Sequence, residues 1–220
     1  KERGMKVVVI DPRLRGAGPF ADEWLPIRPG TDLALALSLC NVLIEQGPID
    51  RDYLKKYTNS PFLVQEDGLF LRVDGKEQVW DPAAGAAKPF DTKGVDVALE
   101  GEFTVGGARV RPAFQVFKEH VAQYKPELAA EICGIPAEAI RRVARELGES
   151  AQIGSTTVVE DVTLPYRPVG IMAYHMSQQE LGFQAIRAMV MVPMLLGAID
   201  AVGGQRVDLS GKIHDNYKKL

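Results

Sequence analysis

Two short polar segments near the start of the chain carry side chains that suit a nucleotide. The first is Asp11-Pro12-Arg13 and the second is Gly30-Thr31-Asp32. The Asp11 carboxylate can accept hydrogen bonds from ribose hydroxyls or from the N1–H and amino group of a guanine. The forked guanidinium of Arg13 suits a phosphate, and a helix that begins at Thr31 or Asp32 would offer free N–H groups to an anion. These residues predict a nucleotide site.

Each of these residues also has a purely structural interpretation. An aspartate before a proline commonly caps its own turn, and Arg13 could be a solvated surface residue. Thr31 and Asp32 are also typical helix N-caps, although capping does not prevent an anion from binding there. The residue types and spacing leave both interpretations open.

A third polar loop, His175 to Gln179, follows an apolar run later in the chain. Gln178 and Gln179 offer amide donors and acceptors that suit a heterocycle such as a pterin or a guanine. His175 has no second metal ligand nearby in the sequence, so metal binding is not expected. Ordinary exposed loop polarity is the alternative for this segment.

The elements that must position these loops alternate between apolar strands and helices. Lys6–Ile10 and Pro168–Tyr174 are predicted as buried strands, and helices are predicted from Thr31 to Gln46 and from Gly182 to Leu196. The chain is therefore predicted to be an α/β protein, with a mostly parallel sheet flanked by helices as in dinucleotide-binding folds. The three polar loops would then lie together at the carboxyl edge of that sheet.

The region 61–112 differs from the rest because it contains short β-like runs separated by turn signals. A hairpin is predicted around Gly106-Gly107, and 82–94 is predicted to be an irregular loop. We predict an α/β domain made of 1–60 and 113–204, a β-rich insertion over 61–112 and an irregular tail over 205–220. Further helices are expected at 113–123, 126–132 and 136–148, and a strand at 155–159 before a turn-rich bridge from Asp161 to Arg167.

Composition and missing motifs exclude several classes of protein. The net charge of −3 argues against a nucleic-acid surface, and no apolar run reaches the ~18 residues that a membrane helix needs. Cys40 and Cys133 are far apart in apolar helical contexts, so two buried thiols are expected instead of a metal or iron–sulfur site. The chain has no GxGxxG, GxxxxGK[ST] or GxSxG motif.

Several segments together resemble the molybdopterin-dependent oxidoreductases of the dimethyl sulfoxide reductase family. The pair VVVIDPR and ADEWLPIRPGTD, at this separation, carries most of the resemblance. It continues in the segments ALAL, LIEQG, GIPAEAIRRVAR, LLGAID and Gly203-Gly204. The resemblance covers most of the chain outside the β-rich block.

The resemblance implies a bis(molybdopterin guanine dinucleotide) cofactor with molybdenum or tungsten. By motif position it implies that Asp11, Pro12, Arg13, Gly30, Thr31 and Asp32 contact one guanine dinucleotide. It also places the loop Tyr174–Gln178 at the pterin, with Tyr174 and Gln178 as site residues. The loop departs from the MGxNQ-like residues of many members, and the ending GAIDAVGG departs from the usual GNIxRPGG.

The resemblance further implies a larger parent protein that performs two-electron redox chemistry. We expect the chain to be a catalytic-subunit fragment that is inactive alone, with its iron–sulfur cluster and metal-ligating residue outside this sequence. A β-rich insertion of this kind looks most like members that act on sulfur or arsenic oxyanions. The expected partners are the remaining domains of the same catalytic subunit, an iron–sulfur electron-transfer subunit and a membrane-anchor subunit. The expected location is the prokaryotic periplasm after Tat export, or the cytoplasm.

Two alternatives to a redox fragment remain at this point. The chain could be a stand-alone nucleotide-binding module, or a regulatory α/β domain whose polar loops are only turns and caps. An upstream cysteine cluster in the reading frame would favour the redox protein.

Overall fold

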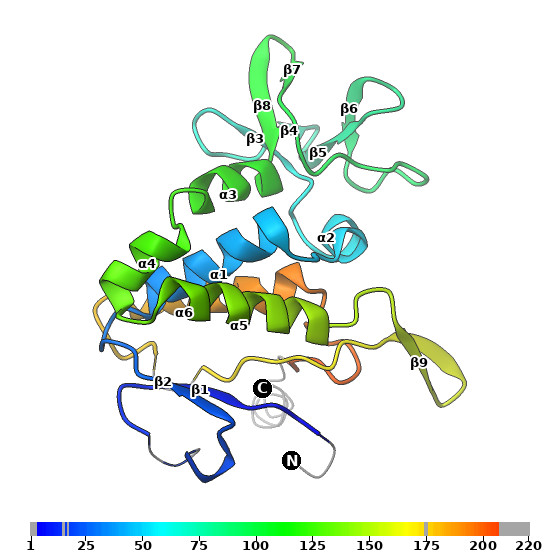
Figure 1. The fold of residues 1–220 in the computed structure, drawn as a ribbon. Coiled ribbons are helices and arrows are strands. Elements are labelled where there is room, and N and C mark those ends of the chain that lie inside the picture. The colour runs from blue at the N-terminus through cyan, green and yellow to red at the C-terminus, as the bar shows by residue number, and fades with distance from the viewer. Residues whose placement is uncertain (1–3, 15, 17, 174–175, 207–220) are drawn as a thin grey trace, which may run out of the picture.

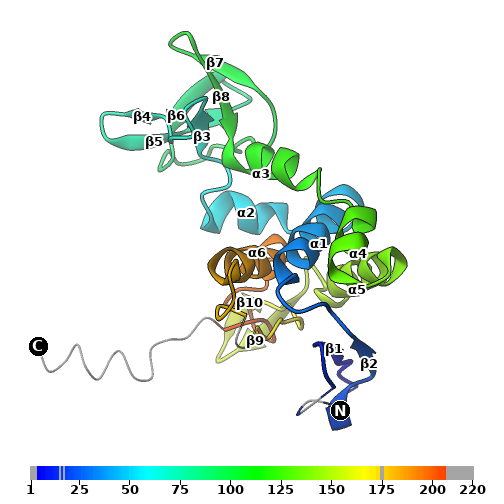
Figure 2. The same ribbon diagram turned by 90° about the vertical axis from the view of Figure 1, so that its left-hand side faces the viewer.

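The helices form a middle layer between two separate β regions (Figure 1). The computed structural model describes residues 4–14, 16, 18–173 and 176–206. The β-rich block lies on one side of the helices and the strands β1 (Val8–Ile10) and β2 (Glu23–Leu25) lie on the other. A view turned by 90° shows the same order of layers (Figure 2). A short 3-10 helix, η1 (Gly18–Phe20), lies between the two strands in sequence.

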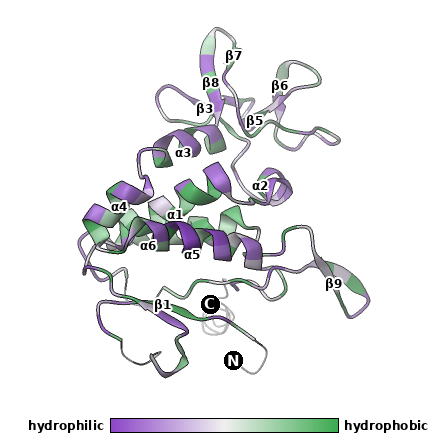
Figure 3. Ribbon diagram, viewed as in Figure 1, coloured by the Kyte–Doolittle hydropathy of each residue, from purple (hydrophilic) through white to green (hydrophobic). Residues whose placement is uncertain are grey.

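The central helix is α1 (Asp32–Gln46), which packs against α6 (Gly182–Leu195), α5 (Ala137–Ser150) and α4 (Pro126–Cys133). Its residues from Ala34 to Leu43 are all buried. A mainly apolar helix that is buried on every face must be covered on every side, and α3 (Ala113–Val121) adds to the cover that these three helices provide. Figure 3 shows the difference in hydropathy between α1 and α6, which are mainly hydrophobic, and α5, which is mainly hydrophilic.

The remaining helices begin and end at residues with recognisable local signals. Asp50 caps α2 (Arg51–Tyr57), because its Oδ1 accepts a hydrogen bond from Tyr53 N at 3.0 Å. The helix α3 (Ala113–Val121) follows β8 directly, and α4 ends at Gly134 with a left-handed φ of 79°. The helical segments predicted from the sequence are therefore confirmed.

The helix α5 runs past its predicted end at Gly148 to Ser150. A Cβ added at Gly148 would lie 2.9 Å from Cδ of Pro48. This glycine therefore permits close packing inside the helix and does not terminate it.

The β-rich block forms two three-stranded antiparallel sheets within the described residues, in the orders β3-β8-β7 and β4-β5-β6. Trp80 and Phe103 stack across the two sheets, with ring centroids 4.2 Å apart. The hairpin predicted around Gly106-Gly107 is confirmed. The loop predicted over 82–94 is partly wrong, because it contributes β6, whose backbone pairs with β5 despite a composition that disfavours strands. The strands are β3 (Leu63–Gln65), β4 (Arg72–Val73), β5 (Lys76–Asp81), β6 (Ala86–Pro89), β7 (Phe103–Val105) and β8 (Ala108–Pro112).

The prediction of a mostly parallel sheet is wrong. Among the described residues, β1 and β2 form the one parallel pair of named strands, and every other pair of named strands is antiparallel. The strand expected at 155–159 exists as β9 (Thr156–Val159), but it pairs with β10 (Val162–Pro165), which lies inside the predicted bridge. Glu160 and Asp161 both have positive φ, which is the conformation of a two-residue hairpin turn. Because of this tight turn, β9 pairs with β10, the strand that follows it in sequence.

The second buried strand, predicted from Pro168 to Tyr174, is also absent over its described residues. Pro168 has no N–H to donate to a sheet. Val169 N bonds to Arg167 O at 2.7 Å, and Ile171 N bonds to Oε1 of Gln205 at 3.0 Å. Because these donors are used by a local turn and by a side chain, no strand ladder forms here.

Within the described residues, no helix has the length and apolar character required to cross a membrane.

The two thiols are buried as expected, and burial of Cys40 predicts a measurable dependence of stability on pH. Desolvation raises the pKa of this thiol from its ordinary value near 9 to about 12. Above pH 9 the unfolded chain therefore releases a proton that the folded chain retains. The free energy of unfolding should fall by about 1.4 kcal/mol per pH unit from this group until pH 12.

Urea denaturation at several pH values from 8 to 10.5 would measure this slope. The Cys40→Ala variant should lose that share of the slope, because it removes the titrating group. Equal slopes for the variant and the parent would show that the thiol is not the source.

Candidate functional site

Asp11 lies at the end of β1, beside the neighbouring strand β2. Its backbone N bonds to Leu25 O at 3.3 Å, and Nε1 of Trp24 donates to its carbonyl at 2.8 Å. Its Oδ1 accepts a hydrogen bond from Arg13 N at 2.7 Å, so the side chain caps its own turn. Pro12 and Arg13 are exposed. The turn therefore presents the second carboxylate oxygen and the guanidinium at the surface.

The segment Gly30-Thr31-Asp32 leads from β2 into α1, and Asp32 is the first residue of the helix. Gly30 has a φ of 81°, which favours glycine. Thr31 is at the N-cap position, but its side chain makes no capping bond; its hydroxyl donates to Arg28 O at 2.7 Å. The carboxylate of Asp32 therefore lies at the positive end of the most buried helix.

The end of α4 holds the approach to this segment in place. Arg28 N donates to Cys133 O at 2.9 Å, and its guanidinium donates to Ile132 O at 3.2 Å. A Cβ added at Gly134 would lie 3.3 Å from Nε of Arg28. Gly134 thus leaves room for the arginine, which ties residues 28–32 to the helical layer.

A residue distant in sequence completes the cluster around Asp32. Gln179 Nε2 donates to Oδ2 of Asp32 at 2.8 Å, and both side chains are partly buried. A Cβ added at Gly30 would lie 3.6 Å from Oε1 of the same glutamine. The structure therefore brings the predicted loop 175–179 to the predicted segment 30–32.

The amide that contacts Asp32 belongs to Gln179, whereas Gln178 is the residue predicted for the site from the sequence. Gln178 is exposed, and it makes an interaction of its own. Tyr174 and His175 lie outside the described residues. Both glutamines had suitable chemistry, and no local sequence signal decides which one turns toward Asp32.

A tight turn before α6 fixes the position of Gln179. Gly182 N donates to Gln179 O at 2.9 Å. A Cβ added at Gly182 would lie 2.4 Å from Ser177 O, so only glycine fits without a shift of the backbone. The start of α6 and the turn at 177–182 are therefore built as one unit.

A buried ion pair between Arg167 and Asp50, which was not predicted from the sequence, holds the chain at residue 167 against the start of α2. Nη2 of Arg167 lies 2.7 Å from Oδ2 of Asp50, and their side chains are only 7% and 9% exposed. Nη1 of Arg167 also donates to Ser155 O at 2.9 Å and to Tyr166 O at 2.8 Å. The sequence gives no signal for this pair, because Asp50 and Arg167 are more than a hundred residues apart.

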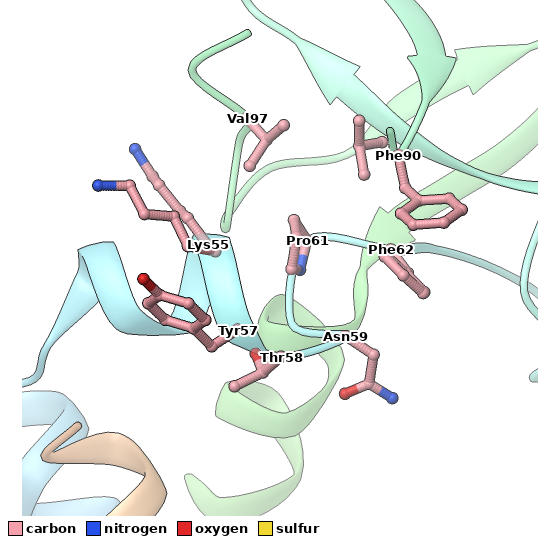
Figure 4. Close-up of a pocket in the computed structure, with 10 residues that line it drawn as sticks. Lys55, Tyr57, Thr58, Asn59, Pro61, Phe62, Phe90 and Val97 are labelled. Carbon is pink, nitrogen blue, oxygen red and sulfur yellow. The ribbon is translucent and has the colours of Figure 1, made fainter. Parts of the chain in front are cut away.

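A shallow depression elsewhere in the molecule is not part of this cluster (Figure 4). It has a volume of about 290 Å³ and lies between α2 and the β-rich block, with Phe62 and Phe90 among its lining residues. Lys55 at its rim is already paired with Asp96 at 2.6 Å. It shares no residue with the segments around Asp11 and Asp32. The described parts of the chain also contain no group of three His, Cys, Asp or Glu residues that could hold a metal ion.

Comparison with known proteins gives consistent results. The family model "Molybdopterin oxidoreductase" matches residues 1–211. A sulfite dehydrogenase subunit from Allochromatium vinosum is 36% identical, over 94% of this chain and 24% of the relative. The formate dehydrogenase-O major subunit of Escherichia coli is 30% identical, over 99% of this chain and 20% of the relative. The chain thus spans about a quarter or less of the length of these relatives.

A solved structure supports the fold. Acetylene hydratase from Pelobacter acetylenicus aligns with a TM-score of 0.52 at 23% identity, covering 89% of this chain and 18% of that one.

Proposed function

Because the chain belongs to the molybdopterin oxidoreductase family, we propose that it holds one guanine dinucleotide end of a bis(molybdopterin guanine dinucleotide) cofactor in a larger catalytic protein. The observation that carries the proposal is the position of Asp32, at the start of α1 and in contact with Gln179. Asp11, Pro12 and Arg13 would supply further contacts, together with Gly30, Thr31 and the loop that contains Tyr174 and Gln178.

The residues fit the nucleotide end of such a cofactor. The Asp32 carboxylate can accept the two parallel donors of a guanine edge. The free N–H groups at the start of α1 and the exposed guanidinium of Arg13 suit phosphate. Gly182 lets the backbone turn at 177–182 close, because a side chain there would collide with Ser177 O.

When bound, the cofactor supplies two-electron redox chemistry through molybdenum or tungsten. This chain's part is to bind and orient one nucleotide, and the metal ligand and any iron–sulfur cluster would come from other parts of the protein. We further propose a sulfur or arsenic oxyanion as the substrate of the whole protein; the relatives named sulfite dehydrogenase and chlorate reductase support an oxyanion, and the first of them supports one of sulfur. Their names as subunits support additional partner chains. We propose that these include an iron–sulfur electron-transfer subunit and a membrane-anchor subunit.

A stand-alone nucleotide-binding or regulatory domain is not favoured. The family model covers nearly all of the chain, and the relatives are proteins about four times its length or more. We further propose the division into an α/β unit over 1–60 and 113–204 with an inserted β-rich unit over 61–112.

Asp32→Ala should weaken GDP binding by about tenfold to a hundredfold, since hydrogen bonds to a charged group contribute about 1.5–3 kcal/mol. Isothermal titration calorimetry with GDP and ADP would measure the change. ADP cannot use the carboxylate in the same way, so its affinity should not change.

Asp52→Ala is a matched control, because Asp52 also lies in the first turn of a helix but its side chain is 80% exposed and remote from the cluster. Equal affinity of the parent chain for GDP and ADP would contradict the proposal. So would an Asp32→Ala variant with unchanged GDP affinity.

A further inference from the structure

The Gln179 amide contacts one of the two oxygens that a guanine edge would need from Asp32 and occupies one of the acceptor positions of that oxygen. A guanine presents N1–H and the 2-amino group side by side, so a paired contact needs both carboxylate oxygens. In the structure, Oδ2 already accepts a hydrogen bond from Gln179 Nε2 at 2.8 Å. We propose that Gln179 competes with the base for Asp32 and so determines how strongly the site favours guanine. This inference rests on the function proposed above.

The backbone of Gln179 is held by contacts separate from the amide contact with Asp32. The backbone is fixed because Gln179 O accepts from Gly182 N at 2.9 Å and because Gly182 closes the turn. The amide itself reaches Asp32 across Gly30, which has no side chain to hold it. In the proposed exchange, rotation about the side-chain bonds of Gln179 would free Oδ2 while the backbone turn stays in place.

The size of the competition follows from one hydrogen bond to a charged acceptor. If that bond favours the closed arrangement by about ten to one, the apparent affinity for guanine falls by about tenfold. A base with a single donor at this edge can bind without breaking the Gln179–Asp32 hydrogen bond. It can donate to Oδ1 while Gln179 still donates to Oδ2. Hypoxanthine is such a base, since it has N1–H and lacks the 2-amino group.

The test compares GDP and IDP binding to the full chain and to Gln179→Ala by calorimetry. The variant should bind GDP about tenfold more tightly, whereas IDP should change by less than about twofold. Gln123→Ala is the matched control, because Gln123 is an exposed glutamine that donates to His120 O far from the cluster. The control should leave both affinities unchanged.

Three other results would overturn the competition. Unchanged GDP affinity in Gln179→Ala would mean that the base and the glutamine share Asp32. Weaker GDP binding would mean that the glutamine supports the ligand. An equal gain for GDP and IDP would mean that the second oxygen is not the point of competition.

The failure of the proposed function has a different signature, because the parent chain would then not prefer GDP to ADP and Asp32→Ala would have no effect. If no variant binds GDP at all, both proposals are rejected.

Discussion

Replacing Arg167 with alanine is expected to lower the free energy of unfolding by about 3–5 kcal/mol. The substitution leaves the Asp50 carboxylate buried without the charge that neutralises it. It also removes the donors to Ser155 O and Tyr166 O. Urea denaturation followed by circular dichroism would measure the loss.

Arg51→Ala is the control, because Arg51 makes an ion pair with Glu100 at the same 2.7 Å but its side chain is 53% exposed. An exposed pair contributes about 1 kcal/mol or less. Similar losses for the two arginine variants would show that burial does not set the strength of the Arg167 pair.

Gly197→Ala is expected to destabilise the fold by about 2–4 kcal/mol through two separate effects. Gly197 has a φ of 64°, which strains any residue with a Cβ. The added Cβ would also lie 2.5 Å from Oδ2 of Asp50, the oxygen that Arg167 contacts. The same denaturation experiment gives the change in free energy.

Gly154→Ala separates the two effects, because Gly154 also has a positive φ, 92°, but an added Cβ there meets nothing within 4 Å. Gly154→Ala should lower the free energy of unfolding only by the contribution of backbone strain, about 1–2 kcal/mol. If Gly197→Ala costs no more than Gly154→Ala, contact with the buried carboxylate is unimportant. In the double variant of Arg167→Ala and Gly197→Ala, the loss of unfolding free energy should be smaller than the sum of the two single losses. Both substitutions disturb the same group, the Asp50 carboxylate.

The helices could be predicted from the sequence because their signals are local. The cap at Asp50, the proline at Pro126 and the left-handed glycine at Gly134 each act on residues within one or two turns. Strand partners that are distant in sequence are not encoded in this way, as for β3 and β8, where Leu63 pairs with Pro112. The pairing of β9 with β10 is local, because a two-residue turn joins them.

The candidate site shows the same limit. Asp11 and Asp32 could be selected as residues because each follows a strand or begins a helix. The pairing of Asp32 with Gln179, and of Asp50 with Arg167, joins residues more than a hundred positions apart. Such pairs depend on how α1 and α6 pack, and this packing follows from the whole fold.

The two halves of the candidate site rest on supports of very different stability. Asp32 begins a helix whose middle is entirely buried, and Arg28 ties the residues before it to the end of α4, so this support is held by the helical layer. Asp11 ends a ribbon of two three-residue strands whose side chains are mostly only half-buried or exposed, and such a ribbon can open locally. A ligand that spans both would therefore meet one fixed support and one that adjusts, and the entropy lost on ordering β1 and β2 would weaken binding at Asp11 alone.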